Sequence, residues 1–240
     1  MIGGGPSLDF CMEEINDLAV SDSVFLLVDI VSEKFIKLYP DTNRIIFTLE
    51  SRSHNYLRAL KNEKIACYVK SRRSNYYENL NECYQFHFDI DTDYPRENSF
   101  QMLSPGTVAG AAIFFALSMA MTALTRNTPV ILFGIDLFYI DNQVYNRLCK
   151  YEIIRDFWTN RESREWVGVL RRTSYIEIIN GSMVRTSAEF LVTRTNLQLL
   201  IQKFNKVVVM DYSPLGISPE YVKKMVPKKI SSEINRDIIR

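Results

Sequence analysis

The sequence lacks an excess of charge of either sign. Its 29 lysine and arginine residues almost balance its 28 acidic residues, which gives a formal net charge of +1 over 240 residues. Proteins that bind nucleic acid through its phosphates present a strongly basic field. Lys70, Arg72 and Arg73 form a local basic cluster that is more typical of a solvated surface. We therefore expect no nucleic-acid partner.

Cysteine is also scarce. The four cysteines form no Cys-x-x-Cys pair, which argues against a zinc site and against a disulfide framework. Single cysteines in apolar surroundings are typical of a hydrophobic core. We therefore expect no metal-ligand set and a reducing, cytoplasmic compartment. The four residues are Cys11, Cys67, Cys83 and Cys149.

One long uncharged run, residues 107–125, could be a membrane span or a buried helix. It contains Gly110, Ser118 and many alanines, and a second apolar run at 130–133 follows it closely. A buried helix that leads into a buried parallel strand explains both runs, so we expect no membrane span. The chain also opens unlike a signal peptide, because Met1 and Ile2 run directly into glycines.

Short apolar runs alternate with helical patterns along the chain, which is typical of an α/β protein. We expect a Rossmann-like, mostly parallel sheet flanked by helices, in one nucleotide-binding domain over residues 1–217. The expected strands are 24–28, 44–49, 65–69, 84–88, 130–133 and 206–210, and the expected helices are 8–18, 106–124 and 188–204. Thr186 and Glu189 have the spacing of a capping box for the last of these helices.

The alternation breaks between residues 141 and 186. Residues 151–172 are rich in arginine and tryptophan, and 175–185 have the pattern of a β-hairpin with a tight turn at Asn180-Gly181. We interpret 141–186 as an insertion that carries this hairpin and caps the sheet. Residues 218–240 are expected to form a charged C-terminal tail.

The first candidate site is the glycine-rich run Gly3-Gly4-Gly5-Pro6-Ser7. Glycines let backbone N–H groups approach a phosphate, and a following helix N-terminus attracts its charge. A plain tight turn is the alternative. The run is not a dinucleotide fingerprint, because the third glycine would fall on Leu8. Such loops normally follow a strand, so the first strand is either very short or truncated. Asp29, after the next strand, could bind a ribose.

The second candidate is Ser104-Pro105-Gly106-Thr107. Ser104 can cap the long helix and Pro105 can occupy its first position, which leaves Gly106 and Thr107 to offer N–H groups and a hydroxyl to an anion. The alternative is an ordinary helix cap.

The third candidate is Asp136, which follows the most apolar strand. Ligands of open α/β sheets bind at the carboxyl ends of strands. A carboxylate there can bind a ribose or sugar hydroxyl, bind a metal, or act as a base, and the alternative is a loop cap. We select Asp136 as the catalytic residue.

Together these runs resemble the family that joins MptE-like 6-hydroxymethylpterin diphosphokinases to the flagellar motility accessory factors. The resemblance covers roughly residues 1–217. It is carried by Gly3 to Leu8, Pro105 to Ala109 and Ile131 to Leu137, and its C-terminal part by Gly181, Thr186-Ser187 and Tyr212 to Ile217. It implies a transferase that uses a nucleotide or nucleotide-sugar. For the motility factors it implies transfer of a sugar, such as a nonulosonic acid, to a protein acceptor such as flagellin.

The same runs are similar, more distantly, to bacterial sialyltransferases that use CMP-sugars. That likeness implies that Tyr139 and Tyr145 bind phosphate. Those enzymes also use a histidine base after the tyrosines, whereas His54 and His87 both precede them here. The sialyltransferase base is therefore absent from this chain.

Three functions remain open at this point. The first is a glycosyltransferase, in which the loop and helix ends stabilise the departing phosphate. The second is an ATP-dependent diphosphokinase acting on a pterin-like alcohol, which needs Mg²⁺ near Asp136 or Asp141. The third is a non-catalytic protein that binds a nucleotide or a partner.

Overall fold

The computed structural model describes residues 1–49, 60, 62–68, 82–88, 99–102, 107–123, 128–138, 149, 174–179, 182–213 and 216–228.

Five parallel strands form the first part of the sheet. They pair in the order β1-β2-β3-β4-β5. The first four, β1 to β4, overlap the strands expected at 24–28, 44–49, 65–69 and 84–88. Their bounds are β1 Val24–Val28, β2 Asn43–Thr48, β3 Lys64–Tyr68, β4 Glu82–Phe88 and β5 Ser99–Met102.

A second group of three parallel strands has the order β10-β9-β6. These are β6 Val130–Leu132, β9 Val209–Asp211 and β10 Lys223–Lys224. The strand expected at 206–210 therefore lies slightly later in the chain. The strand expected at 130–133 lies inside the sheet, as predicted, because it has a neighbour on each side.

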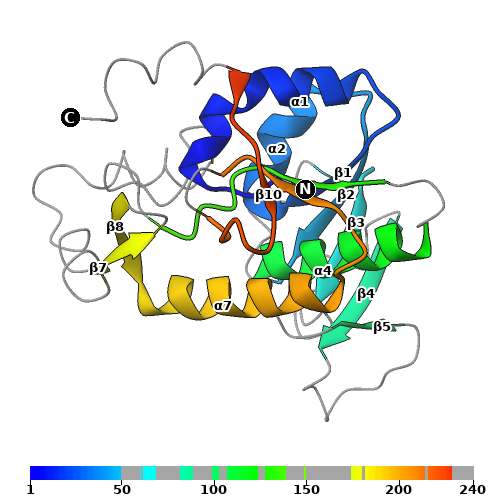
Figure 1. The fold of residues 1–240 in the computed structure, drawn as a ribbon. Coiled ribbons are helices and arrows are strands. Elements are labelled where there is room, and N and C mark those ends of the chain that lie inside the picture. The colour runs from blue at the N-terminus through cyan, green and yellow to red at the C-terminus, as the bar shows by residue number, and fades with distance from the viewer. Residues whose placement is uncertain are drawn as a thin grey trace, which may run out of the picture.

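The N-terminal residues join the two groups into one sheet. Ile2 forms parallel bridges to Leu27 of β1 on one side and to Phe133, next to β6, on the other. Its amide donates to the Leu26 carbonyl at 2.8 Å, and the Phe133 amide donates to the Met1 carbonyl at 3.0 Å. The two bridges thus place Ile2 at the centre of the sheet, and N lies near the middle of Figure 1.

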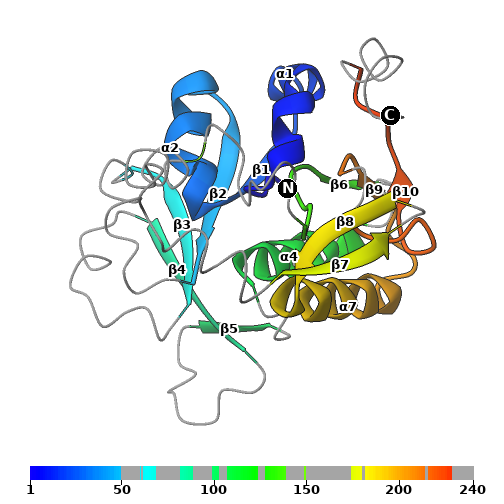
Figure 2. The ribbon, with the colours of Figure 1, turned by 90° about the vertical axis from the view of Figure 1, so that its left-hand side faces the viewer.

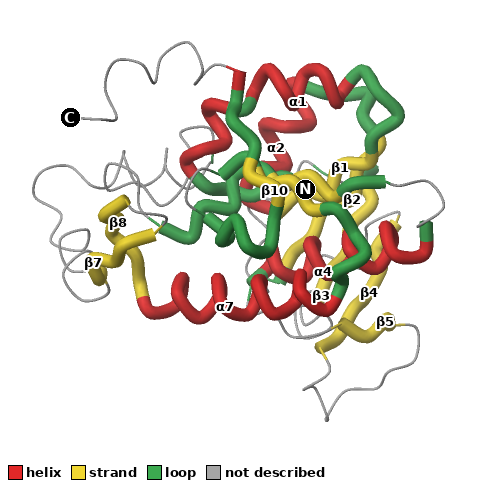
Figure 3. The backbone as a smooth tube through the Cα atoms, in the orientation of Figure 1, coloured by secondary structure: helices red, strands yellow, loops and turns green. Residues whose placement is uncertain are grey.

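Helices cover both faces of this sheet, so the molecule has three layers. The segments η1 Pro6–Phe10, α1 Met12–Ala19 and α2 Asp29–Leu38 lie on one face. The helices α4 Val108–Thr122 and α7 Ala188–Lys203 lie on the other, beside each other. Figures 1 and 2 show the two helical layers from two directions, and Figure 3 shows the strands between them. The α/β, Rossmann-like class and the mostly parallel sheet are therefore confirmed.

The long apolar run forms α4, which packs on the sheet as predicted. Its alanines let the helix approach β1, β2 and β6 closely, and Ile113 and Leu117 are fully buried. Within the part of the chain that the structure describes, no helix has both the length and the apolar character needed to cross a membrane.

Two helix caps differ from the prediction. Thr107, not Ser104, is the N-cap of α4, and its hydroxyl accepts from the Gly110 amide at 3.1 Å. Ser187, not Thr186, caps α7 and accepts from the Phe190 amide at 3.2 Å. In both cases two hydroxyl residues stand near the helix start, and the one that caps is the one directly before the first helical residue.

The expected β-hairpin is present. Strands β7 Ser174–Ile179 and β8 Ser182–Ser187 pair antiparallel, with Ile179 opposite Ser182. Figure 2 shows this hairpin on the α4 and α7 side of the sheet. The division into a domain over 1–217, an insertion over 141–186 and a tail over 218–240 remains a prediction.

Candidate functional site

The strand order reverses at the N-terminal strand. The chain first builds β1 to β5 on one side of Ile2, and then places β6, β9 and β10 on the other side. Such a topological switch point is where open α/β sheets bind ligands, outside the carboxyl ends of the strands. The segments that leave this edge are the glycine-rich loop after Ile2 and the loop Gly134–Phe138 after β6. The sheet therefore brings the first and third sequence candidates together.

The glycine-rich loop packs directly against the loop after β6. A Cβ atom on Gly5 would collide with the Asp136 carboxylate and lie 2.7 Å from the Gly134 carbonyl oxygen. A Cβ on Gly3 would collide with the same carbonyl and with Ile135. The loop is thus glycine-rich because two backbones meet here. Pro6 begins the short helix η1, as its fixed φ favours.

Most N–H groups of this loop are already bonded inside the protein. The Gly3 and Gly5 amides donate to carbonyl oxygens after β6, at 2.8 Å each, and Pro6 has no N–H. Gly4 is half-buried, and its amide donates to no described residue. The Cys149 thiol donates to the Gly4 carbonyl at 3.6 Å. Among the described residues, the Gly4 amide is therefore the loop amide without a hydrogen-bond acceptor.

Asp136 is a buried carboxylate held by the glycine-rich loop. The residue is 2% exposed, and its Oδ2 accepts from the Ser7 amide at 2.7 Å. Burial raises the pKa of Asp136 to about 6, although the amide and hydroxyl of Ser7 act in the opposite direction. A carboxyl group with this pKa changes its charge close to neutral pH.

Two buried polar atoms at this point have no hydrogen-bond partner among the described residues. They are the Ser7 hydroxyl oxygen and Asp136 Oδ1. The Ser7 hydroxyl is near enough to the carboxylate to lower its pKa, but not in hydrogen-bonding geometry. Buried polar atoms in folded proteins are nearly always bonded to protein, water or ligand. Among the described residues, these two atoms are therefore the ones at this edge that still need a hydrogen-bond partner.

The backbone on both sides of Asp136 is left-handed. Gly134 has φ 65° and Leu137 has φ 57°. A non-glycine residue in this region costs about 1 kcal/mol or more, and such strain gathers at functional sites. The Thr186 hydroxyl donates to the Leu137 carbonyl at 2.9 Å, so β8 stabilises the strained turn. This geometry fixes the direction in which the Asp136 carboxylate points.

A second buried carboxylate lies at the end of β9. Asp211 is fully buried and accepts from the Ser213 amide at 2.9 Å, the Ile217 amide at 3.4 Å and the Lys224 ammonium at 2.7 Å. Burial raises its pKa, and Lys224 opposes that shift. The Ser213 hydroxyl accepts from the Ile135 amide at 2.8 Å, which ties this cluster to the Asp136 loop.

The remaining predicted site residues are placed as follows. Thr107 lies at the N-terminus of α4, and its hydroxyl is used as the cap. Asp29, at the start of α2, accepts from the Thr48 hydroxyl at 2.7 Å and from the Ile30 amide at 2.8 Å. Four further residues lie outside the described residues: Ser104, Gly106, Tyr139 and Tyr145.

Sequence reasoning missed three parts of this edge: Asp211, Lys224 and the contact of Cys149 with Gly4. Asp211 follows an apolar strand in the same way as Asp136, so the same pattern could have found it. Lys224 belongs to a strand of two residues, which has no detectable pattern of its own.

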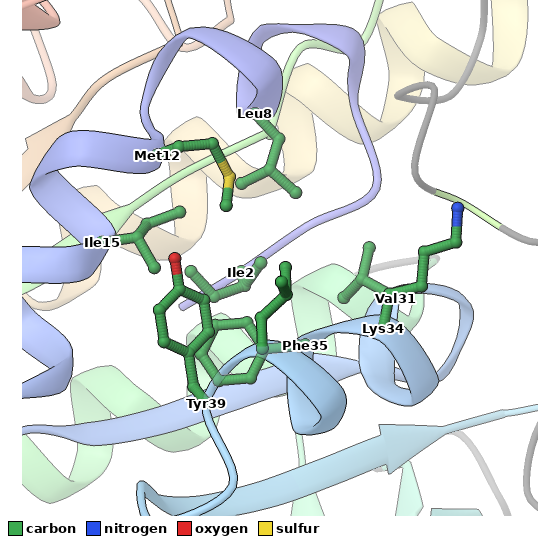
Figure 4. Close-up of a pocket in the computed structure, with 9 residues that line it drawn as sticks. Ile2, Leu8, Met12, Ile15, Val31, Lys34, Phe35 and Tyr39 are labelled. Atoms are coloured by element: carbon green, nitrogen blue, oxygen red, sulfur yellow. The ribbon is translucent and has the colours of Figure 1, made fainter.

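A small apolar pocket lies elsewhere, between α1 and α2. Figure 4 shows side chains of both helices around Ile2, with the ammonium of Lys34 pointing away from the aromatic rings. The pocket offers a nucleotide almost no polar partner, and it lies on a helical face of the sheet. Its lining residues are Ile2, Leu8, Met12, Ile15, Val31, Lys34, Phe35, Leu38 and Tyr39. It belongs to the packing of the two helices and is separate from the candidate site.

Comparison with known proteins identifies the fold. No protein-family model matches the chain, and no curated protein sequence matches it. Among solved structures, the chain is similar to a MAf glycosyltransferase from Magnetospirillum magneticum AMB-1, with a TM-score of 0.62 and 14% identity over 98% of this chain. The chain spans 35% of that protein's length. At this identity the likeness shows a shared fold, in agreement with the resemblance to motility accessory factors.

Proposed function

We propose that this chain is a glycosyltransferase domain of the motility accessory factor type. In this proposal it binds a nucleotide-activated sugar at the switch point and transfers the sugar, such as a nonulosonic acid, to a protein hydroxyl such as one on flagellin. The observation that carries the proposal is the contact between the glycine-rich loop and Asp136, made at the point where the strand order reverses. The solved glycosyltransferase with the same fold supports the reaction class.

Asp136 is the proposed catalytic carboxylate. Its Oδ1 has no partner among the described residues, whereas the carboxylate of Asp211 already accepts three hydrogen bonds. A base works best when its pKa is near the working pH, and the pKa of Asp136 is about 6. In the transfer step, the acceptor oxygen bonds to the anomeric carbon while the bond from that carbon to the phosphate oxygen breaks. Asp136 takes the acceptor proton, and the nucleotide leaves with the bonding electrons.

The phosphate contacts in this proposal come from neutral groups. The Gly4 amide has no acceptor among the described residues, and the N-terminus of α4 follows β5 at the same sheet edge. Tyr139, Tyr145, Ser104 and Gly106 are proposed to complete the phosphate contacts. Neutral donors suit a monophosphate or diphosphate better than a triphosphate with its larger charge.

Calorimetric titration tests this function. We expect CMP or a nucleotide-sugar to bind without Mg²⁺. In a separate assay of sugar transfer, Asp136→Asn should remove the activity while the protein stays folded. Asp41→Asn, which changes an exposed carboxylate in a turn, is the matched control and should retain activity. Binding of ATP only with Mg²⁺, with no binding of CMP or nucleotide-sugars, would contradict the proposal and favour an MptE-like diphosphokinase.

A further inference from the structure

Lys224 is a cation that contacts one of the two buried carboxylates, Asp211, and acts on the charge of the other, Asp136. It lies at the carboxyl end of β10, and its ammonium donates to Asp211 Oδ2 and to the Ser213 carbonyl, at 2.7 Å each. Its positive charge also lowers the pKa of Asp136. Lys224 therefore stands at the same sheet edge as the glycine-rich loop and close to the loop that carries Asp136.

Among the described residues, the hydrogen bonds of Lys224 leave one of its N–H donors without a partner. A lysine ammonium has three N–H donors, and Lys224 uses two of them on described residues. The side chain is 22% exposed, whereas that of Asp211 is fully buried. A ligand can therefore reach the ammonium, whereas the Asp211 oxygens already accept from Lys224 and two backbone amides.

Asp211 and Ser213 also hold the ammonium in place. Lysine side chains normally lose rotamer freedom when they bind a ligand. Here two fixed acceptors have already immobilised the ammonium, so a ligand anion would meet a positioned charge. Asp211 has two backbone amides as further partners, so Lys224 is not its only source of hydrogen bonds.

We propose that Lys224 binds a phosphate group of the ligand, donating its third N–H to a phosphate oxygen. This inference rests on the proposed function, because it places the phosphate of the bound nucleotide at the β9–β10 end of the switch-point edge. Asp211 then acts as a positioning residue that orients the ammonium and partly neutralises it. The proposal adds one cation to a site whose other proposed phosphate donors are neutral.

The test removes the two charges of the pair in steps, so that the buried carboxylate is never left without its cation. Asp211→Asn removes the negative charge and keeps one oxygen, which can accept from one of the two amides, because the Ser213 amide donates to Oδ1 and the Ile217 amide to Oδ2. Adding Lys224→Met then removes the positive charge without leaving a buried carboxylate unpaired, which would itself be destabilising. Lys223→Met in the same Asp211→Asn background is the matched control, since Lys223 is the exposed neighbour on β10. Thermal denaturation confirms that each variant is folded.

The probes are inorganic pyrophosphate and CMP, measured by calorimetry at low and high salt. Asp211→Asn serves as the common background, because the loss of positioning and the loss of the competing carboxylate change the affinity in opposite directions. Adding Lys224→Met should weaken binding about tenfold or more relative to Asp211→Asn, as loss of a hydrogen bond to a charged group does, and should reduce the salt dependence. Lys223→Met in the same background should leave the affinity and its salt dependence unchanged.

Chemical labelling of the natural protein gives an independent measurement if the double variant does not fold. Pyrophosphate should protect Lys224, but not Lys223, from reductive methylation detected by mass spectrometry. If CMP binds and neither the affinity nor the labelling depends on Lys224, this inference is wrong and the proposed function stands. If pyrophosphate binding depends on Lys224 while no nucleotide or nucleotide-sugar binds, the inference holds and the proposed function fails.

Discussion

Replacing Asp136 with asparagine should change how the stability of the protein depends on pH. Burial raises the pKa of this carboxyl from 3.8 to about 6, so the folded state binds the proton more tightly than the unfolded state does. The contribution of Asp136 to stability is therefore largest below about pH 4 and is lost as the pH rises to about 6. A shift of this size corresponds to about 3 kcal/mol, at ~1.4 kcal/mol for each pKa unit.

The assay is urea denaturation of the natural protein and of Asp136→Asn at several pH values from 4 to 8. The difference between their free energies of unfolding should change by most of this amount, about 2 kcal/mol, between pH 4 and pH 7, with the Asp136→Asn variant becoming relatively more stable as the pH rises. The amide of the new side chain adds a constant term, because it does not titrate. Asp41→Asn, at an exposed position, controls for the loss of a charge as such.

A constant difference across this pH range would refute the reasoning. It would mean that the carboxyl of Asp136 keeps an ordinary pKa, and hence that it is solvated or paired with a cation. The argument that Asp136 is poised as a base near neutral pH would then also fail.

Three further predictions concern other residues: Gly5, Arg44 and the pair of Cys67 and Cys83. Gly5→Ala should lower the free energy of unfolding by about 1–3 kcal/mol and weaken nucleotide binding, because the methyl group collides with the facing loop; unchanged urea denaturation and titration would contradict this. Arg44→Lys should cost about 1–2 kcal/mol in the same denaturation assay, because lysine cannot reproduce the two 2.7 Å bonds to Glu63 together with those to the turn carbonyls. Cys67 and Cys83 have sulfur atoms 3.2 Å apart. They should nevertheless form no disulfide with each other after treatment with oxidised glutathione, which mass spectrometry would show. They are offset by two residues on adjacent strands, so their Cα atoms are about 8 Å apart, too far for an unstrained disulfide.

The strands that the sequence predicts well are those buried on both faces. Val24–Val28 and Val130–Leu132 are continuous apolar runs because helices cover both sides of a parallel sheet. The edge strand Ser99–Met102 was not predicted, because it is short and alternates polar with apolar residues. Asp29–Leu38 was also missed as a helix, since it follows β1 without any intervening loop residue.

The central strand could not be recognised from its own residues. Only Ile2 forms the bridges, and its strand character comes from two neighbours, β1 and the end of β6, that lie far away in the sequence. Hydrophobic periodicity cannot appear in a segment of this length. The sequence nevertheless indicated that a strand should precede the glycine-rich loop, because such loops connect a strand to a helix.

The candidate site was predictable where a polar residue directly follows a buried strand. This rule placed Asp136 and the glycine-rich loop at one sheet edge, and the structure joins them through the Ser7 amide. The rule says nothing about partners that arrive through tertiary pairing. Lys224 reaches Asp211 because β10 adds to the sheet beside β9, across 13 positions in the chain.

The charges at this edge divide the proposed site into two halves with different chemistry. Asp211 accepts from Lys224 and from two amides among the described residues, so the partly exposed ammonium is the group that can meet an anion. Asp136 has one amide partner and a second oxygen without a partner among the described residues, so it offers an acceptor to a hydroxyl group. A ligand that carries both a phosphate and hydroxyl groups matches this division, whereas a simple anion would be repelled by Asp136 and a simple sugar would leave Lys224 unused. This combination of groups favours a nucleotide-sugar over either fragment alone.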